Sequence, residues 1–330
     1  MSTLRKDPTT GSWVILAPER ESRPHAKPSD TRRQLPEYDT DCPFCPGNEK
    51  QTPPEILRVP ASGPWRVRVI PNLYGVLGGD GSTERTGAPM MREMPGIGSS
   101  EVVVETPRHD QRLDEVDDDG VATVIRVWRD RYSALISEPG IHAVVVFKNE
   151  GPLAGTSLEH SHSQIVAVPV PLPRMLHRMD IATAYYVDTG HSLYDDLVDA
   201  ERKEGTRIVA ETDRFVVLEP FASGSPFETW ILPSEHQGSF SELRDEDIQE
   251  LAILLKRTLA AVREVCGDPD YNLVLSSAPS DGQSSRVFIW HFTLLPRLSA
   301  AAGFELGSGI SVNTVPPEEA AEKLMATMRS

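Results

Sequence analysis

The sequence contains little cysteine, few aromatic residues and a deficit of positive charge. Its 330 residues include three cysteines and 6% aromatics, and 33 lysines and arginines stand against 49 aspartates and glutamates, a net charge of −16. An odd, small cysteine count argues against the disulfide framework of a secreted protein. The acidity argues against nucleic-acid or anionic-membrane binding, since both require a net basic face. We therefore expect neither partner, whereas a small anionic substrate needs only a local set of donors.

Long apolar runs are also absent. The opening MSTLRKDPTTGSW contains no apolar segment of an export signal, and no stretch approaches about 18 uninterrupted apolar residues. We therefore expect a cytoplasmic protein. The length suggests two domains or one large one, with ample residues for a hydrophobic core.

A repeated order of elements indicates an internal duplication. The order strand, proline, histidine, helix, strand, loop and histidine-bearing strand occurs twice. In the first copy His162 follows His109 by 53 residues, and in the second His291 follows His236 by 55. The alternative is a chance coincidence of two α+β halves, because the intervening sequences share little. We predict an α+β protein of two related halves, residues 1–170 and 171–330.

The segment EHSHSQ concentrates groups that suit chemistry better than packing. If it begins a strand, His160, His162 and Gln164 share one face. Such convergent side chains suit metal binding or the handling of a phosphate. The C-x-x-C pair Cys42 and Cys45 indicates a metal knuckle, a redox pair or two packed free thiols. For a zinc site, His109 and one histidine of EHSHSQ are the candidates for the remaining ligands.

Six segments, in this order, closely resemble the galactose-1-phosphate uridylyltransferase family of the histidine-triad superfamily. They are CPFCPGN, WRVRVIPNLY, EVVVETPRHD, FKNEGPLAGTSLEHSHSQ, FETWILPSEH and PRLSAAAGFELGSGI. The resemblance covers nearly the whole chain. It implies two histidine-triad-like halves, each an antiparallel sheet with packed helices, and a homodimer that shares its active site across the interface. Some members of this branch transfer adenylyl groups (the ADP-glucose phosphorylase type).

The resemblance also implies roles for the central motif. His162 matches the nucleophile, which takes UMP from UDP-glucose as a phosphoramidate and passes it to galactose 1-phosphate, a ping-pong covalent reaction. Gln164 stands where hydrolytic relatives have a third histidine, and its amide is neither an acid nor a base at neutral pH. The resemblance further implies one structural zinc ion with Cys42, Cys45, His109 and His160 as its ligands.

Further residues match positions that bind the substrates in this family. Forked arginine donors suit phosphate oxygens, although two arginines in a charged arm are also common as solvated residues. The matches are Asn149 and Ser157 near the phosphates, Arg20 and Arg23 reaching across the dimer interface, Asn72 at the nucleotide, and Phe304 and Glu305 at the sugar.

The second half departs from the family pattern. Relatives often bind another metal there, but both thiolates are missing because the C-x-x-C position reads SLYD, from Ser192 to Asp195. His236 and His291 remain, and Ile289 stands where relatives have a histidine. We therefore expect this second site to be lost. Two rival functions remain: adenylyl transfer between ADP-glucose and phosphate, and a catalytically inactive nucleotide-binding protein, which the intact EHSHSQ motif argues against.

Overall fold

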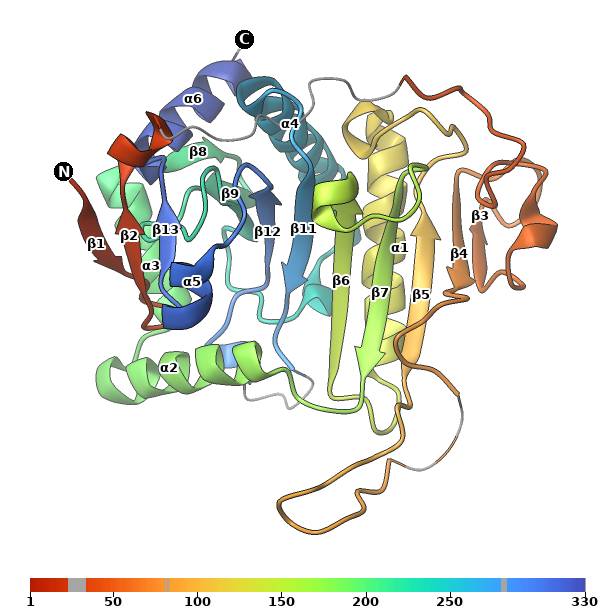
Figure 1. The fold of residues 1–330 in the computed structure, drawn as a ribbon, viewed down its shortest axis with the longest axis horizontal. Helices are drawn as coiled ribbons and strands as arrows, with labels where there is room; N and C mark the ends of the chain where they lie inside the picture. The colour runs from red at the N-terminus through yellow and green to blue at the C-terminus, as the bar shows by residue number, and fades with distance from the viewer. Residues whose placement is uncertain (23–33, 80, 82, 280–283, 330) are drawn as a thin grey trace.

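A ten-stranded antiparallel sheet runs through the computed structural model, which describes residues 1–22, 34–79, 81, 83–279 and 284–329 (Figure 1). The strand order is β3-β4-β5-β7-β6-β11-β12-β10-β9-β8. The strands are β3 (Leu57–Val59), β4 (Val67–Pro71), β5 (Ser99–Val104), β6 (Ala143–Glu150), β7 (His162–Val168), β8 (Ile208–Glu211), β9 (Phe215–Leu218), β10 (Thr229–Pro233), β11 (Tyr271–Ser276) and β12 (His291–Pro296).

The sheet order is palindromic, which confirms the predicted duplication. Read outward from the centre, one half runs β6-β7-β5-β4-β3 and the other runs β11-β12-β10-β9-β8. The two long helices, α1 (Asp118–Ile136) and α4 (Ile248–Cys266), occupy the same place in each half, between the third and fourth strands in chain order. The halves join where β6 pairs with β11, with Asn149 opposite Asn272.

The remaining elements lie around this sheet. A separate small sheet has the order β1-β2-β13, so the first strands of the chain pair with a strand near its end. The predicted boundary at residue 170 falls between β7 and α2. The additional elements are β1 (Thr3–Lys6), β2 (Trp13–Leu16), β13 (Ser311–Asn313), α2 (Pro173–Thr189), α3 (Leu193–Glu204), α5 (Gly303–Ser308), α6 (Pro317–Arg329), and the 3-10 turns η1 (Pro18–Ser22), η2 (Glu49–Gln51), η3 (Leu113–Glu115), η4 (Pro152–Ala154), η5 (Phe240–Glu242), η6 (Asp245–Asp247) and η7 (Ser284–Arg286).

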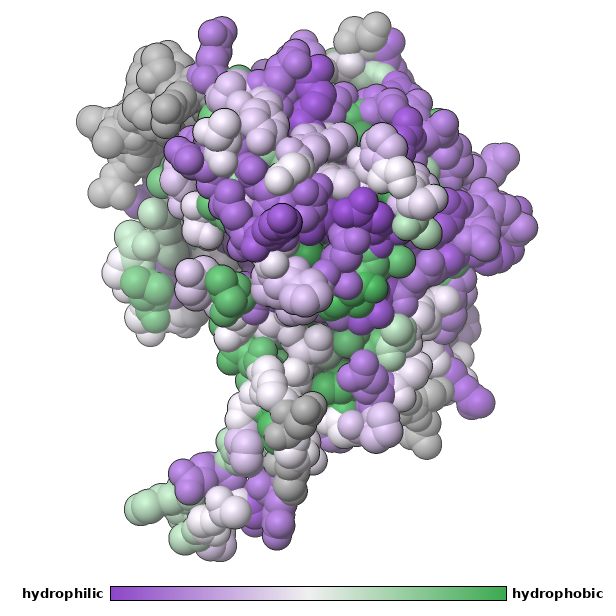
Figure 2. Space-filling model, turned by 90° about the vertical axis from the view of Figure 1, so that its right-hand side faces the viewer, coloured by the Kyte–Doolittle hydropathy of each residue, from purple (hydrophilic) through white to green (hydrophobic). Residues whose placement is uncertain are grey.

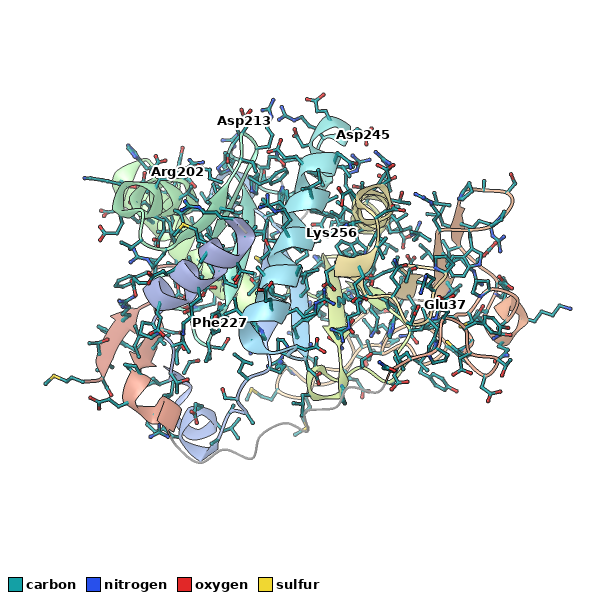
Figure 3. All side chains as sticks on the ribbon, turned by 90° about the horizontal axis from the view of Figure 1, so that it is seen from above. Glu37, Arg202, Asp213, Phe227, Asp245 and Lys256 are labelled. Atoms are coloured by element: carbon teal, nitrogen blue, oxygen red, sulfur yellow. The ribbon has the colours of Figure 1, made fainter. Side chains whose placement is uncertain are left out.

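Alternation along the strands assigns the two faces of the sheet. On β5, Val103 packs against the helices α1 and α4, whereas Val102 and Val104 pack on the other face with the Cys42–Cys45 segment. Helices α1, α4 and α6 lie side by side when seen from above, and Lys256 of α4 donates to Asp118 of α1 at 2.8 Å (Figure 3). The opposite face therefore remains for the site in the first half, while α2 and α3 cover it in the second.

Local sequence explains where the long helices begin and end. Asp117 caps the start of α1 by accepting from the backbone N–H of Gly120 at 2.6 Å. Gly190, Gly205 and Gly267 end α2, α3 and α4 in the left-handed region, where a residue without a Cβ is favoured.

A long loop between β4 and β5 projects from the body of the molecule (Figure 1), and the space-filling view shows it standing clear of the surface (Figure 2). The chain there exposes Tyr74, Val76, Met90 and Met91. None of the helices in the described ranges is long and apolar enough to cross a membrane.

Two tryptophans give a matched test of this packing. Trp290 is fully buried and contacts the rings of Phe240 and Phe292, whereas Trp13 is 48% exposed. Trp290→Ala should lower the free energy of unfolding by about 3–5 kcal/mol, because it leaves a cavity. Trp13→Ala should change it by less than about 0.5 kcal/mol. Urea unfolding measures both, and equal effects would contradict the described core.

Candidate active site

The four predicted metal ligands come together on the open face of the first half. Cys42 Sγ and Cys45 Sγ each lie 3.6 Å from His160 Nδ1, and Cys45 Sγ lies 3.6 Å from His109 Nδ1. All four donor atoms are within 4.8 Å of one another, and all four residues are buried. Ligand bonds of about 2.0–2.3 Å around a tetrahedral ion separate neighbouring donors by about 3.6 Å. The cluster can therefore hold one metal ion.

The tautomer of His160 suits this site. Its Nε2–H donates to the backbone carbonyl of Thr106 at 2.8 Å, which leaves the Nδ1 lone pair directed at the cysteines. Burial lowers the pKa of His160 to about 4, so the ring is neutral at neutral pH. Burial raises the pKa of the Cys42 thiol to about 11. A bound ion must therefore displace the proton of this thiol, and its affinity falls as the pH falls.

His162 opens β7, two residues after His160. Its Nδ1–H donates to the carbonyl oxygen of His160 at 2.8 Å, so Nε2 carries the lone pair. The ring of Phe44 meets it edge-on at 5.4 Å. The side chain is buried, and this burial lowers its pKa, which favours the neutral form that a nucleophile requires.

A cleft of about 850 Å³ opens beside His162 and is built by both halves of the chain. The first half contributes Asn149 and the loop from Glu150 to Ser161, and the second half contributes Asp270. Among the charged lining residues in the described part of the chain, Arg112 is the only cation and carboxylates predominate. They are Asp110, Glu115, Glu150, Glu159 and Asp270.

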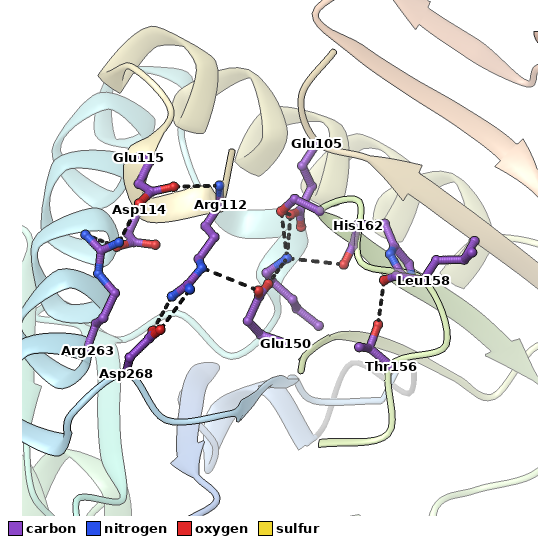
Figure 4. Close-up of polar contacts among 12 residues, drawn as sticks. Glu105, Arg112, Asp114, Glu115, Glu150, Thr156, Leu158, His162, Arg263 and Asp268 are labelled. Atoms are coloured by element: carbon purple, nitrogen blue, oxygen red, sulfur yellow. Dashed lines mark hydrogen bonds and ion pairs between the residues drawn. The ribbon is translucent and has the colours of Figure 1, made fainter. Parts of the chain in front are cut away.

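Arg112 is held by carboxylates rather than directed freely at a ligand. Its guanidinium pairs with both oxygens of Asp268 and lies 3.9 Å from Glu150 (Figure 4). These partners raise the pKa of Arg112 despite partial burial, which opposes the shift. The cleft therefore presents an excess of negative charge on its own surface.

Beneath His162 lies a buried ionic network that the sequence alone did not predict. Lys148 Nζ donates to Glu105 at 2.7 Å and Ser161 Oγ at 2.9 Å, and it lies 3.2 Å from Glu150 and 3.4 Å from the carbonyl oxygen of His162. Ser161 Oγ donates to the same Glu105 oxygen at 2.7 Å. The network ties β6 and the residue that follows β5 to the turn that carries His160 and to His162 at the start of β7. The only signal in the sequence was a lysine inside a strand of valines.

Gln164 lies two residues after His162 on β7, so the two side chains are on the same face of the strand. Asn72 Nδ2 donates to Gln164 Oε1 at 3.2 Å. Asn72 Oδ1 accepts from the backbone N–H of Tyr74 at 3.0 Å, which fixes which end of Asn72 faces Gln164. The amide nitrogen of Gln164 is consequently turned away from Asn72.

Of the other predicted substrate-binding residues, Ser157 adjoins this cleft between the lining residues Thr156 and Leu158, whereas Arg20, Phe304 and Glu305 do not line it. Ser157 is exposed in the loop between β6 and β7. Arg20 is exposed in η1, which directly follows β2, and β2 belongs to the small sheet, away from β7 (Figure 1). Arg23 lies outside the described residues. Phe304 and Glu305 lie in α5, and Phe304 is 53% exposed.

The second half uses its matching histidines differently. His236 pairs with Asp195 at 2.8 Å, which raises the pKa of His236, while Ser192 caps α3. His291 Nδ1–H donates to the carbonyl oxygen of Ile289 at 3.0 Å, as His162 does in the first half. Its Nε2 accepts from Arg178 at 3.2 Å. Its ring stacks on Trp230 at 4.4 Å, and burial lowers the pKa of His291 to about 3.

Comparisons with known proteins identify the class of this protein as a nucleotidyltransferase. The chain belongs to the galactose-1-phosphate uridyl transferase family: the model of the N-terminal domain matches residues 1–170, and that of the C-terminal domain matches residues 178–305. It is 35% identical over 324 residues to an ADP-glucose phosphorylase of Arabidopsis thaliana, covering 97% of this chain and 91% of the relative. It is 28% identical to a galactose-1-phosphate uridylyltransferase of Haemophilus influenzae, covering 98% and 93%.

Solved structures show the same relationship. A crystal structure of an ADP-glucose phosphorylase from Arabidopsis thaliana with bound ADP-glucose has a TM-score of 0.84 and 32% identity, with 98% of each chain covered. A uridylyltransferase structure has a TM-score of 0.77 and 31% identity, covering 100% of this chain and 99% of that one.

Two cysteine variants test the metal cluster. Cys45→Ser removes one of four ligands, so a preparation that holds about one metal ion per chain should lose it under mild chelation and melt at a lower temperature. Cys266→Ser, at the end of α4 and outside the cluster, should retain the ion. Elemental analysis with thermal unfolding measures both. Full metal retention by Cys45→Ser would contradict the assignment.

Proposed function

We propose that the chain transfers a nucleoside monophosphate from a nucleoside diphosphate hexose to a phosphate-bearing acceptor through a covalent intermediate on His162. The observation that carries the proposal is the hydrogen bond from His162 Nδ1 to the carbonyl oxygen of His160. It keeps the proton on Nδ1 and leaves Nε2, at the cleft, as the nucleophilic atom.

The reaction has two balanced steps. His162 Nε2 attacks the α-phosphorus, a P–N bond forms, and the bond to the bridging oxygen breaks with its electron pair leaving on the hexose 1-phosphate. An oxygen of the acceptor phosphate then attacks the same phosphorus, and the P–N bond breaks to restore neutral imidazole. The Nδ1–H group of His162 stays hydrogen-bonded to the carbonyl oxygen of His160 in both steps. This carbonyl therefore stabilises the positive charge that the ring carries in the intermediate.

Gln164 and Asn149 suit the handling of the phosphoryl oxygens. An amide donates hydrogen bonds but neither protonates a leaving group nor activates water at neutral pH. A glutamine beside the nucleophile therefore favours an intermediate that waits for its acceptor. Ser157, in the adjoining loop, is proposed as a further phosphate contact.

For the metal we propose zinc, because two thiolates and two imidazoles in a closed, buried set are its preferred ligands. A bound zinc ion would supply structural cross-linking. The backbone carbonyl of Thr106 accepts a hydrogen bond from His160 and holds its ring in place. The backbone carbonyl of His160 in turn accepts the hydrogen bond from His162 Nδ1.

For the substrates we propose UDP-glucose and galactose 1-phosphate, supported by both family models and by relatives named galactose-1-phosphate uridylyltransferase. ADP-glucose with phosphate is the second candidate. It is supported by the 35% identity to an ADP-glucose phosphorylase and by the likeness to its ADP-glucose complex.

We also propose that a homodimer completes the site. Among the described residues, five carboxylates line the cleft, and its one arginine, Arg112, is already paired with Asp268. A diphosphate bound there therefore needs positive charge from outside the cleft. Arg20, which is exposed, and Arg23 are proposed to reach the partner's nucleotide. Asn72 is proposed to contact the nucleotide, and Phe304 and Glu305 the sugar.

Intact mass spectrometry tests the intermediate and the donor together. Mixing the protein with UDP-glucose or ADP-glucose, without acceptor, should add the mass of one uridylyl or one adenylyl group. His162→Asn should abolish the adduct, because an amide nitrogen is not nucleophilic, while the chain remains folded. His177→Asn, at an exposed position on α2, is the matched control and should still form it.

Persistence of the adduct in His162→Asn would refute the nucleophile. Absence of any adduct from the wild type with both donors would refute the proposed function.

A further inference from the structure

Asn272 belongs to the second half of the chain but contacts the phosphate-side asparagine of the first. It lies on β11 opposite Asn149 of β6, at the join of the duplicated halves. Its Nδ2 donates to Asn149 Oδ1 at 2.7 Å and to the carbonyl oxygen of Ala154 at 2.9 Å. Its Oδ1 accepts from Arg297 Nε at 2.5 Å. The amide nitrogen of this buried side chain therefore has two hydrogen-bond partners, and its oxygen has one.

These partners fix the orientation of two amides in series. The carbonyl of Ala154 only accepts and the guanidinium of Arg297 only donates, so Asn272 has a single orientation that satisfies both. The NH₂ group of Asn272 then faces Asn149 and donates to its Oδ1. The NH₂ group of Asn149 is therefore turned to the other side, and Asn149 lines the cleft beside His162.

We propose that Asn272 is a positioning residue for nucleotidyl transfer: through Asn149 it holds an amide N–H donor toward the phosphoryl oxygens that His162 attacks. This inference rests on the proposed function. With the opposite orientation, Asn149 would present a carbonyl oxygen to the same anion, and a stabilising contact would become a repulsive one.

The first half contains a parallel arrangement, which supports the inference. Gln164 has its oxygen engaged by Asn72, and Asn72 is itself fixed by the backbone N–H of Tyr74. Two site amides, Gln164 and Asn149, are thus each oriented by an asparagine that a main-chain group locks. In both cases the amide nitrogen is the end left for a ligand.

The same segment of the second half also holds the loop that leads to His162. Asp270 Oδ2 accepts from the backbone N–H of Leu153 at 2.5 Å. Gly151 has φ of +84°, and a Cβ there would lie 2.0 Å from Asp270 Oδ1, so the close approach requires glycine. The second half therefore supports both the loop and the donor beside the nucleophile.

Asn272→Asp tests the proposal at nearly constant shape. A carboxylate cannot donate to Asn149, so Asn149 turns its NH₂ group toward Asp and its oxygen toward the phosphate. The single-turnover rate of adduct formation should fall by about 10- to 100-fold, with kcat affected more than KM, because the contact acts on the phosphoryl group in transfer. Placed in an Asn149→Ala background, the same substitution should have no further effect.

Two controls separate positioning from a general loss of structure. Asn313→Asp alters another buried asparagine, whose NH₂ group donates to Ser223 and Ser225 far from the cleft, and it should change stability without changing the rate. Arg297→Gln, at an exposed position, removes the lock on Asn272 and should lower the rate in the same direction by a smaller factor. It also tests the proposal if Asn272→Asp does not fold.

A wild-type rate in Asn272→Asp, or an equal loss in the presence and absence of Asn149, would overturn the inference. The proposed function is tested separately, by adduct formation in the wild type.

Discussion

A single hydrogen bond between neighbours in sequence, from His162 Nδ1 to the carbonyl oxygen of His160, organises the site. A backbone carbonyl only accepts, so it keeps the proton of the neutral His162 ring on Nδ1. It also couples two functions. The residue that provides the carbonyl also belongs to the cluster that could hold a metal ion, and the carbonyl of Thr106 orients its ring. The Cys/His cluster, the backbone and the proposed nucleophile thus form one chain of contacts.

The second half has the same hydrogen bond, but there it does not leave Nε2 of the histidine free for a ligand. His291 donates to the carbonyl of Ile289 in the same way, but Arg178 occupies Nε2 and aromatic rings enclose the imidazole. Ile289 stands two residues before His291, where the first half has His160, and no second group of three or more potential metal ligands is found in the described residues. The duplicated half instead contributes across the β6–β11 pair, where Asp268, Asp270 and Asn272 reach the first half.

The sequence predicted the parts of the site that local motifs encode. The C-x-x-C pair, His109 and EHSHSQ predicted a four-ligand cluster, and the repeated element order predicted a duplicated sheet, because spacing and alternation are local properties. Alternation placed His160 in the strand, whereas β7 begins at His162 and His160 lies on the turn before it. That turn is what allows His160 to face the cysteines.

The parts that it did not predict depend on register between distant strands. Lys148 meets Glu105 only because β6 and β5 both flank β7, and Asn272 meets Asn149 only because β11 pairs with β6 in one register. Neither pairing can be predicted from a single segment of the sequence. The roles of Arg20 and Arg23 depend on a second chain, and these roles and those of Phe304 and Glu305 remain predictions.

The most direct measurement is ¹⁵N and ³¹P NMR of the nucleotidylated protein labelled at histidine. The account predicts a phosphorus–nitrogen coupling at Nε2 of His162, a proton retained on its Nδ1, and a metal-bound Nδ1 on His160. Phosphorus on Nδ1 of His162, or on any other histidine, would contradict it.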